Sequence, residues 1–228
     1  MIEVINELFP IHLTVLRLYC DRLFQDNGGS LRLAITGALP DRPLLHHHKE
    51  DGSSDYSLSE IRYLVIDGIP HIVTFGKGRG VLDEVSRLKL LRVRHVEYKV
   101  SGFDFIEDGI IIGVSNQLRT YASITPWLAL NQENAAKFRC SRGVARKDLL
   151  NSILVGNCLS LLKGLNIRIC SRIMTEIVEY HSARVQMEVS MMGFHIRFVS
   201  NFAIPEFLGL GKMPSKGFGL MRLAGNSK

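Results

Sequence analysis

Apolar positions near the start of the chain predict a strand followed by a helix. Residues 11–19 would place apolar side chains on much of both faces of an extended chain, as in a strand buried on both sides. Residues 31–38 have apolar positions at helical spacing, and Ser30, after a Gly-Gly turn, is expected to cap this helix. Prolines then end the helix, and a long polar loop is expected over residues 41–59.

The next part of the chain predicts a hairpin, a second helix and a further strand. The apolar runs 61–67 and 71–75 flank a short turn at residues 68–70. Two glycines precede a helical pattern over residues 81–88, and residues 93–100 alternate as a strand does. The order strand–helix–strand–strand–helix–strand is that of a ferredoxin-like unit.

The second half of the chain repeats a strand, a helix and a long hairpin. The strand is predicted at residues 110–125 and the helix at residues 146–163. The hairpin is predicted to pair residues 173–180 with residues 184–199 about a turn at 181–183. Residues 218–223 can supply a closing strand, and a glycine-rich loop takes the place of the second helix. We therefore expect an α+β protein with two tandem ferredoxin-like (RRM-like) domains and a C-terminal glycine-rich loop. The domains are expected at residues 1–100 and 101–228.

Composition excludes several classes of protein. With 228 residues, 46% of them hydrophobic and 22% charged, the chain has an ordinary globular composition rather than a disordered or disulfide-stapled one. The longest uncharged run, residues 149–162, is too short and too polar to span a bilayer. An acidic N-terminus does not resemble a signal peptide, so a soluble cytoplasmic protein without a membrane partner is expected. The four cysteines form no CxxC pair and are expected to be reduced.

Positive charge is concentrated in one block of the sequence. The formal net charge is +6, and residues 137–172 hold eight Lys and Arg against a single acid, Asp148. Such a block suits a polyanion, because phosphate binding is driven by counterion release, although charge runs are also common on solvated faces. The candidate phosphate contacts in this block are Arg139, Arg142, Arg146 and Lys147.

Three adjacent histidines offer a candidate catalytic segment in the 41–59 loop. In an extended chain, His46 and His48 point to the same side with Cα atoms roughly 6.6 Å apart, far enough to bracket a phosphate. A pair of imidazoles titrating near neutrality can act as base and acid on a phosphodiester. A polar surface loop and a metal site with these two ligands remain alternatives. Tyr56 could orient a histidine or anchor the loop.

A second candidate segment is the glycine-rich stretch 209–219. It holds four glycines, two lysines and a serine, a composition that allows backbone N–H groups to approach phosphates closely. It has neither the GxxxxGK[ST] spacing of a P-loop nor the helix that follows a dinucleotide fingerprint. Nucleoside triphosphate chemistry is therefore disfavoured.

These segments, in this order, resemble the CRISPR repeat-processing endoribonucleases, the sixth Cas family of the RAMP superfamily. Residues 201–219 look like that superfamily's C-terminal glycine-rich loop, with Ser215 and Gly217-Phe218-Gly219 as its most characteristic part. Residues 41–52 resemble the branch in which a Phe-His-Asn-His segment follows the first helix. Residues 125–131 and 150–164 resemble the inter-domain strand end and central helix of the family.

The resemblance implies an enzyme that binds the repeat of a precursor CRISPR RNA and cuts it without a metal or cofactor. The 2′-OH attacks the adjacent phosphate and leaves a 2′,3′-cyclic phosphate and a 5′-OH. His46, His48 and Tyr56 are the implied catalytic residues. The implied RNA contacts, beyond the four in the basic block, are Lys49, Gly209, Gly211, Lys212, Ser215, Lys216, Gly217 and Gly219. Other CRISPR effector proteins and a second copy of the chain are further partners to be considered.

The sequence departs from the family pattern at two places. His47 stands where the family usually has Asn, and residues 57–63 differ from its usual Pro and Gln-Tyr-Lys strand, which makes Arg62 a candidate replacement for a lost basic contact. A catalytically inactive RNA-binding RAMP subunit of a CRISPR complex is therefore the alternative to the endoribonuclease. A hydrolase with a metal ion bound by histidines is the third hypothesis for the function.

Overall fold

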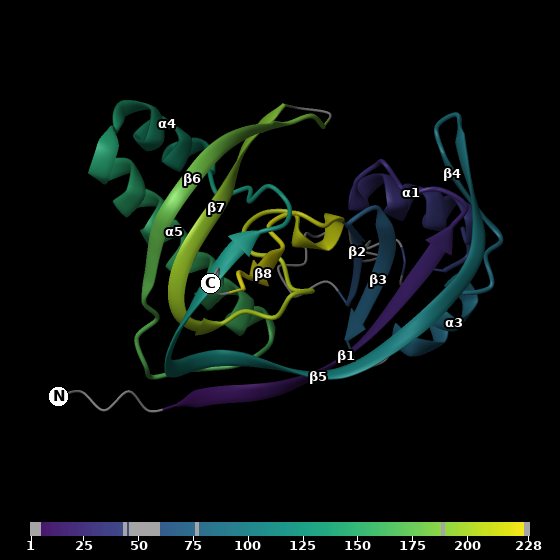
Figure 1. The fold of residues 1–228 in the computed structure, drawn as a ribbon, viewed down its shortest axis with the longest axis horizontal. Coiled ribbons are helices and arrows are strands. Elements are labelled where there is room, and N and C mark those ends of the chain that lie inside the picture. Colours follow the sequence, from purple (N-terminus) through teal and green to yellow (C-terminus); the bar gives the residue numbers. More distant parts are fainter. Residues whose placement is uncertain (1–5, 43–44, 46–59, 76–77, 188–189, 226–228) are drawn as a thin grey trace. The chain divides into compact units, whose positions relative to one another are not determined.

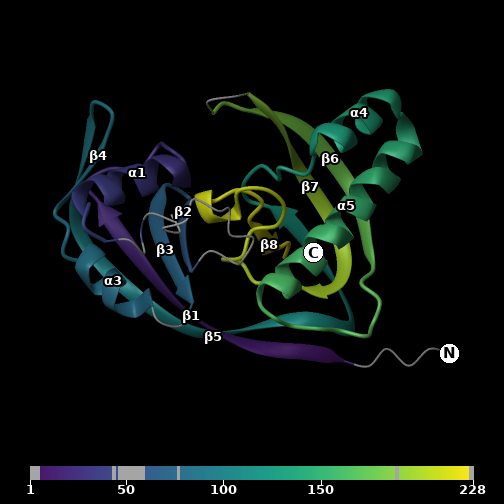
Figure 2. The same ribbon diagram turned by 180° about the vertical axis from the view of Figure 1, so that it is seen from behind.

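The computed structural model describes residues 6–42, 45, 60–75, 78–187 and 190–225. They form two compact units, which we describe separately. The N-terminal unit comprises Ile11–Ile110 and Ser215–Gly217, and the C-terminal unit comprises Met1–Pro10, Ile111–Pro214 and Phe218–Lys228. Figures 1 and 2 show the labelled elements from opposite sides.

The N-terminal unit has the predicted order of elements. These are β1 (Glu7–Cys20), α1 (Gly28–Ala38), β2 (Ile61–Ile66), β3 (Ile69–Phe75), α3 (Arg79–Val85), β4 (Leu90–Val93) and the first part of β5 (Val96–Ser123). The strands lie in the order β2-β3-β1-β5, and β4 pairs with β5. β2 and β3 form an antiparallel hairpin, as predicted, and β3 pairs antiparallel with β1.

Three details of this unit differ from the sequence-based expectation. α1 is capped by Asn27, whose side chain accepts hydrogen bonds from the Gly29 and Ser30 N–H groups, so Ser30 is inside the helix rather than at its cap. The β2–β3 turn consists of Asp67 and Gly68, both with positive φ, and Pro70 lies within β3. The strand predicted over residues 93–100 is two strands, β4 and β5, which pair on either side of a turn.

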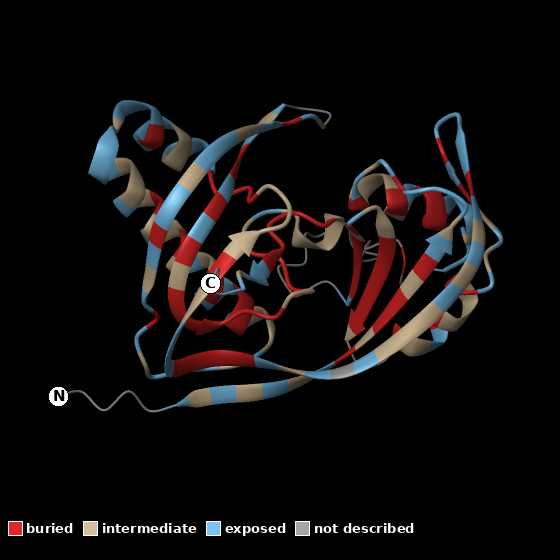
Figure 3. Ribbon diagram, in the orientation of Figure 1, coloured by how far each residue is buried: buried red, intermediate tan, exposed pale blue. Residues whose placement is uncertain are grey.

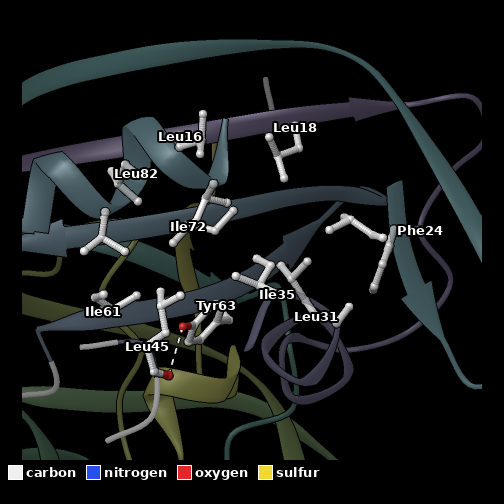
Figure 4. Close-up of a cluster of buried hydrophobic side chains, with 14 of the residues drawn as sticks. Leu16, Leu18, Phe24, Leu31, Ile35, Leu45, Ile61, Tyr63, Ile72 and Leu82 are labelled. Atoms are coloured by element: carbon white, nitrogen blue, oxygen red, sulfur yellow. Dashed lines mark hydrogen bonds between the residues drawn. The ribbon is translucent and has the colours of Figure 1, made fainter. Parts of the chain in front are cut away.

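The helices α1 and α3 of the N-terminal unit contribute to one apolar core (Figure 4). Leu31 and Ile35 of α1 and Leu82 of α3 are fully buried there. Strand residues complete the core, among them Leu16, Leu18, Ile61, Tyr63 and Ile72. Because residues of one face of each strand meet both helices, the sheet and the helices form two packed layers.

The C-terminal unit contains the rest of β5 and four further regular elements with a short closing strand. These are α4 (Gln132–Cys140), α5 (Gly143–Gly164), β6 (Thr175–Val185), β7 (Met191–Ala203) and, as the closing strand, β8 (Met221–Leu223). The 3-10 turn η2 (Pro214–Lys216) begins in this unit at Pro214, and its Ser215 and Lys216 belong to the N-terminal unit. β6 and β7 form a long antiparallel hairpin, and β5 pairs antiparallel with both β7 and β8. The predicted closing strand and the long helix are confirmed.

Two expectations for the C-terminal unit are wrong. α4 was not predicted, and the hairpin turn is not at residues 181–183, where β6 continues with His181 opposite His195. The pairing instead extends to Val185 opposite Met191. His-Ser-Ala has no residue that requires a turn, so the strand continues wherever its partner offers a ladder of hydrogen bonds.

Aromatic rings form the core beneath α4. Phe138 of α4 meets Phe194 of β7 with ring centres 5.2 Å apart, and Tyr180 of β6 lies 6.2 Å from Phe194. Trp127 is fully buried beside them, and its backbone N–H and C=O both bond to Phe194 at 2.8 and 2.9 Å. Figure 3 shows buried segments along β7, whose other positions alternate with exposed ones.

β5 is a single strand of 28 residues that passes from one unit into the other. The boundary expected near residue 100 falls inside this strand, and the units change over at Ile110 and Ile111. Among the described residues, no helix is long and apolar enough to cross a membrane.

Candidate functional site

Four of the implied catalytic and RNA-binding residues lie outside the described residues, as does His47. The four are His46, His48 and Tyr56, the implied catalytic residues, and Lys49, an implied RNA contact. Their roles therefore stay predictions. The residue immediately before them, Leu45, is described and belongs to the core of the N-terminal unit.

Leu45 is held in place by its side chain and by both of its backbone polar groups. The side chain is fully buried, the N–H donates to Arg42 O at 3.0 Å, and the C=O accepts from the Tyr63 hydroxyl at 3.2 Å (Figure 4). Burial raises the pKa of Tyr63 well above its usual value, so the phenol stays a hydrogen-bond donor at ordinary pH. The chain thus reaches His46 from a fixed position in the N-terminal unit.

The backbone of Tyr63 also contacts the first turn of α1 and the tip of the glycine-rich loop. A Cβ on Gly28 would lie 1.9 Å from Tyr63 O and 2.6 Å from Lys216 O, so only glycine fits between them. Gly217 has φ +84°, and a Cβ there would lie 3.1 Å from the same Tyr63 oxygen. Tyr63 therefore links Leu45, α1 and residues 215–217 within one unit.

Lys216 brings a positive charge to this first turn. Its Cδ lies 3.8 Å from the position that a Cβ of Gly29 would occupy. The 3-10 turn η2 carries Lys216 at its end, and Ser215, another implied RNA contact of this tip, precedes it in the same turn. The tip of the glycine-rich loop and the start of α1 thus form one edge of the N-terminal unit, together with the chain that leads to His46.

The rest of the glycine-rich loop belongs to the C-terminal unit and has a structural role there. The N–H groups of Lys212 and Gly219 donate to Leu128 O and Pro126 O, each at 3.0 Å. Gly211 has φ +86°, and a Cβ there would lie 2.8 Å from Trp127 Nε1. The Lys212 and Gly219 donors thus face carbonyl groups of the protein, and the glycines allow the loop to dock on residues 126–128.

The basic block divides into engaged and free side chains. The Arg146 guanidinium lies 4.7 Å from the Phe138 ring centre and its Nε donates to Phe138 O, while Lys147 Nζ donates to Val178 O at 2.9 Å. Arg142 occupies the N-cap position of α5 and is exposed. Arg139 is exposed on α4. Arg146 and Lys147 therefore contribute to the packing of this unit. RNA contact by these two residues stays a prediction.

Arg62, the candidate replacement for a lost basic contact, is buried. Its residue is 1% exposed, and its guanidinium carbon lies 5.5 Å from the Phe75 ring centre. Nε and Nη1 have no hydrogen-bond partner in the described part of the chain. Burial lowers the pKa of Arg62 to about 10, because desolvation disfavours the charged form.

Sequence reasoning missed the two residues that organise the edge around α1. Gly28 was read only as part of a turn, although a Gly-Gly pair directly after an Asn cap is a signal for close backbone approach. Tyr63 was read only as a strand residue, and nothing in its local sequence marks its two contacts.

The fold and this edge together define a RAMP-type protein with two tandem ferredoxin-like units and a glycine-rich loop after the last long strand. Comparison with family models assigns both halves of the chain. The Cas6b N-terminal domain matches residues 10–105, and the Cas6b C-terminal domain matches residues 113–223. The chain belongs to the Cas6b family, which confirms the resemblance and the fold expected from the sequence.

Individual relatives agree with this assignment. The chain is 37% identical over 108 residues to "Uncharacterized protein MJ0978" of Methanocaldococcus jannaschii, a match that covers 47% of this chain and 74% of that protein. The solved structure named "Crystal structure of CRISPR RNA processing endoribonuclease Cas6b" is 26% identical with a TM-score of 0.70, covering 94% of this chain and all of that one. A second solved structure, "Crystal structure of Cas6b", has a TM-score of 0.84 over the same shares at 24% identity, and so supports the fold.

Proposed function

We propose that this protein binds the repeats of a precursor CRISPR transcript and cuts each once to give guide RNAs. The observation that carries the proposal is the match of both halves of the chain to Cas6b domains, together with the 26% identical structure named as a CRISPR RNA processing endoribonuclease. The edge around α1 supports it, because the chain leading to His46, the cation of Lys216 and the first turn of a helix belong to the same unit.

The proposed reaction is a transesterification within the RNA strand. One of His46 and His48 removes the proton of a 2′-OH, the 2′ oxygen forms a bond to the adjacent phosphorus, and the bond from phosphorus to the 5′ oxygen breaks. The other histidine gives a proton to the departing 5′ oxygen. The products are a 2′,3′-cyclic phosphate and a 5′-OH, and no metal takes part. Tyr56 would orient a histidine or touch the phosphate.

Cations beside the reacting phosphate would stabilise the charge that develops on its oxygens. Lys49 is the sequence neighbour of the histidines, and Lys216 lies at the first turn of α1. The backbone N–H of Lys212 donates to Leu128 O in the C-terminal unit, and its side chain would contact the RNA backbone. Ser215 and the exposed Arg139 and Arg142 would extend the backbone contacts.

The test is a cleavage assay on repeat RNA transcribed from the neighbouring array, in excess EDTA, with the product ends mapped. We expect one cut per repeat, a cyclic phosphate or 3′-phosphate on one product, and no cut when the 2′-OH at that position is replaced by hydrogen. Cleavage that needed added Mg²⁺ would overturn the mechanism.

A double variant separates the enzyme from the inactive RNA-binding subunit. Substituting His46→Ala and His48→Ala together should abolish cleavage and leave RNA affinity within about twofold, since neither side chain is needed for backbone contacts. If the natural protein binds repeat RNA tightly but never cuts it, the inactive-subunit alternative is correct.

Salt dependence tests the two lysines of the glycine-rich loop separately. Each phosphate contact adds roughly 0.7 to the slope of log affinity against log salt for single-stranded RNA. Lys212→Ala and Lys216→Ala should each lower that slope by up to this amount. An unchanged slope for one variant removes that lysine from the interface.

A further inference from the structure

A hollow of about 830 Å³ lies in the C-terminal unit beyond the aromatic core under α4. Its walls come from the start and the exposed side of α4, from the facing ends of β6 and β7, and from the glycine-rich loop. The lining residues that the argument uses are Leu130, Arg139, Arg184, Met191, Met192 and Lys212. Ligand sites of small molecules have volumes of this order, about 300–1,000 Å³.

The charge of the hollow has one sign over its described lining. Arg139, Arg184 and Lys212 are exposed and make no ion pair or hydrogen bond through their side chains with other described residues, and none of the described lining residues is acidic. The acid nearest to them on α4, Glu133, is bonded to Lys137 at 2.6 Å and does not line the hollow. Three free cations around one hollow attract an anion with several charges.

The hollow also has an apolar wall. Met192, the second residue of β7, is 47% exposed, and Leu130 is 8% exposed. Met191 also lines the hollow, but it packs against the cluster of Leu128, Val185 and Phe218. Methionine side chains are flexible and polarisable, which suits a planar ring held by dispersion forces rather than by a fixed set of hydrogen bonds. Cations beside an exposed apolar wall match a nucleotide, which has a charged phosphate and a planar base.

The backbone that supports these side chains is well held. The Lys212 N–H donates to Leu128 O, and Asn131 caps α4 by accepting from the Asn134 N–H at 2.7 Å. Arg184 faces Met192 in the register of the β6–β7 hairpin. The backbone around the hollow is therefore held by bonds within the protein, so that mainly the exposed side chains have to be ordered when a ligand binds.

We propose that this hollow binds one or two unpaired nucleotides of the repeat RNA, with backbone phosphate on Arg139, Arg184 and Lys212 and a base against Met192. The proposal rests on the proposed function and adds to it a place where the RNA is read as a single strand. An unpaired base can leave its stack and enter a hollow, whereas a base inside a duplex presents only its edge in a groove. An acidic protein segment is the competing ligand.

The first measurement is the affinity of the whole protein for the repeat RNA with charge-matched variants. Arg184→Ala should weaken binding by about tenfold, as expected for a lost phosphate contact in a formed site. Arg197→Ala is the matched control, since Arg197 is exposed on β7, in the same unit, and does not line the hollow. It should change affinity by no more than about twofold. Equal losses for the two variants would reduce the hollow to general charge and overturn the proposal.

The second measurement isolates the base. Met192→Ala should weaken binding by about fivefold to tenfold without changing its salt dependence, and Met174→Ala, at a residue that is also 47% exposed in the same unit, should have no effect. Repeats with one abasic position each should then be titrated. One or two abasic positions should cost the natural protein as much as Met192→Ala does, and should cost the Met192→Ala variant nothing more.

The remaining outcomes separate this proposal from the proposed function. If the natural protein cuts the repeat but Arg184→Ala and Met192→Ala behave like their controls, the hollow is not a nucleotide site and the function stands. If it binds the repeat through both residues but does not cut, the hollow stands and the function fails. No binding to single-stranded repeat RNA, or an equal loss with a fully duplex RNA, overturns the proposal, and the acidic protein segment then becomes the ligand to test.

Discussion

The two units of the chain contain the same number of basic residues and differ in how these are balanced. The N-terminal unit, residues 11–110 and 215–217, has 14 Lys and Arg against 14 Asp and Glu, a balance of zero. The rest of the chain has 14 Lys and Arg against 8 Asp and Glu, which is the whole net charge of +6. Attraction for a polyanion therefore comes from the C-terminal unit.

The same contrast holds for individual side chains. In the N-terminal unit, arginines form ion pairs with acids, as Arg42 does with Glu84 and Arg92 with Glu97. The C-terminal unit has ion pairs too, such as Lys137 with Glu133, but Arg139, Arg184 and Lys212 line its hollow without such partners among the described residues. Exposed ion pairs contribute little to stability, but they do cancel the field that would attract RNA.

Packing shows the opposite contrast. Around the first turn of α1, the N-terminal unit leaves no space beside Gly28, whereas the C-terminal unit keeps a hollow at the start of α4. A tightly packed first turn of α1 in a neutral unit suits the positioning of neighbouring groups, and a cationic hollow suits the binding of phosphates. Under the proposed function, the N-terminal unit would position the catalytic groups and the C-terminal unit would bind the RNA.

The largest effect is expected at Gly28, in the tightly packed first turn of α1. Gly28→Ala should lower the free energy of unfolding by about 3 kcal/mol, because the new methyl group would meet two backbone oxygens that cannot move independently. The measurement is chemical denaturation. Gly37→Ala is the control in the same helix, since nothing lies within 4 Å of a Cβ there, and it should stabilise by about 0.5–1 kcal/mol. Equal effects of the two variants would show that α1 does not approach Tyr63 as described.

Arg62 is the one described arginine of the N-terminal unit that is fully buried without partners for its Nε and Nη1. Arg62→Met should raise the free energy of unfolding by about 1–3 kcal/mol, because it removes a buried charge and keeps an unbranched apolar stem. Burial lowers the pKa of Arg62 to about 10, so the cost of the charge is fully present below that pH and fades only as pH rises toward 12.5. The gain should therefore be constant from pH 6 to pH 9.

The Arg62→Met substitution also tests whether the charge of Arg62 is needed for RNA binding or cleavage. Unchanged RNA affinity and cleavage in Arg62→Met would leave the C-terminal unit as the source of attraction. A loss of cleavage with a gain in stability would give Arg62 a role in the reaction and would weaken the division between the units.

Tyr63 tests the positioning of the histidine segment. Tyr63→Phe removes the hydrogen bond to Leu45 O and should cost about 1 kcal/mol of stability, since a buried carbonyl loses its partner. The single-turnover cleavage rate should fall by about tenfold, while RNA affinity stays unchanged. Tyr121→Phe is the control, because the buried Tyr121 hydroxyl accepts from Ile204 N–H in the C-terminal unit. It should cost similar stability and leave the cleavage rate of the folded protein unaltered.

The smallest effect concerns a carboxylate at the edge of the C-terminal unit. Glu7 accepts hydrogen bonds from the N–H groups of Cys170 and Ser171, and these bonds lower its pKa below the ordinary 4.5. A carboxyl group with a lowered pKa stabilises the fold above pH 4.5, and this contribution is lost as pH falls through the lower, folded value. Glu7→Gln should therefore lower the melting temperature slightly at pH 7, and the difference should shrink below pH 4. Glu176→Gln, at an exposed position of β6, should show neither effect.

Local patterns predicted those elements whose apolar period is clear, as in residues 11–19, 61–67 and 146–163. They did not predict α4, because residues 132–140 contain a single large apolar side chain, Phe138, and so have no stripe to detect. α4 forms because Asn131 caps it and because Phe138 packs among rings from β6 and β7. Those rings lie more than forty residues further along the chain.

The candidate site shows the same limit. The glycine-rich loop was found from its composition. Only the tertiary structure shows that part of it is hydrogen-bonded to residues 126–128, while its tip lies beside the first turn of α1. Lys212 and Lys216, only four residues apart, belong to different units for this reason.

The amino-acid sequence by itself determined the family, the two ferredoxin-like halves and the segments that carry candidate chemistry, because motifs and apolar periods are local properties of a chain. Only the tertiary structure decided that Tyr63 joins Leu45, Gly28 and Gly217, and that Arg139, Arg184 and Lys212 share one hollow. Such groupings depend on contacts between residues distant in sequence, which no local preference encodes.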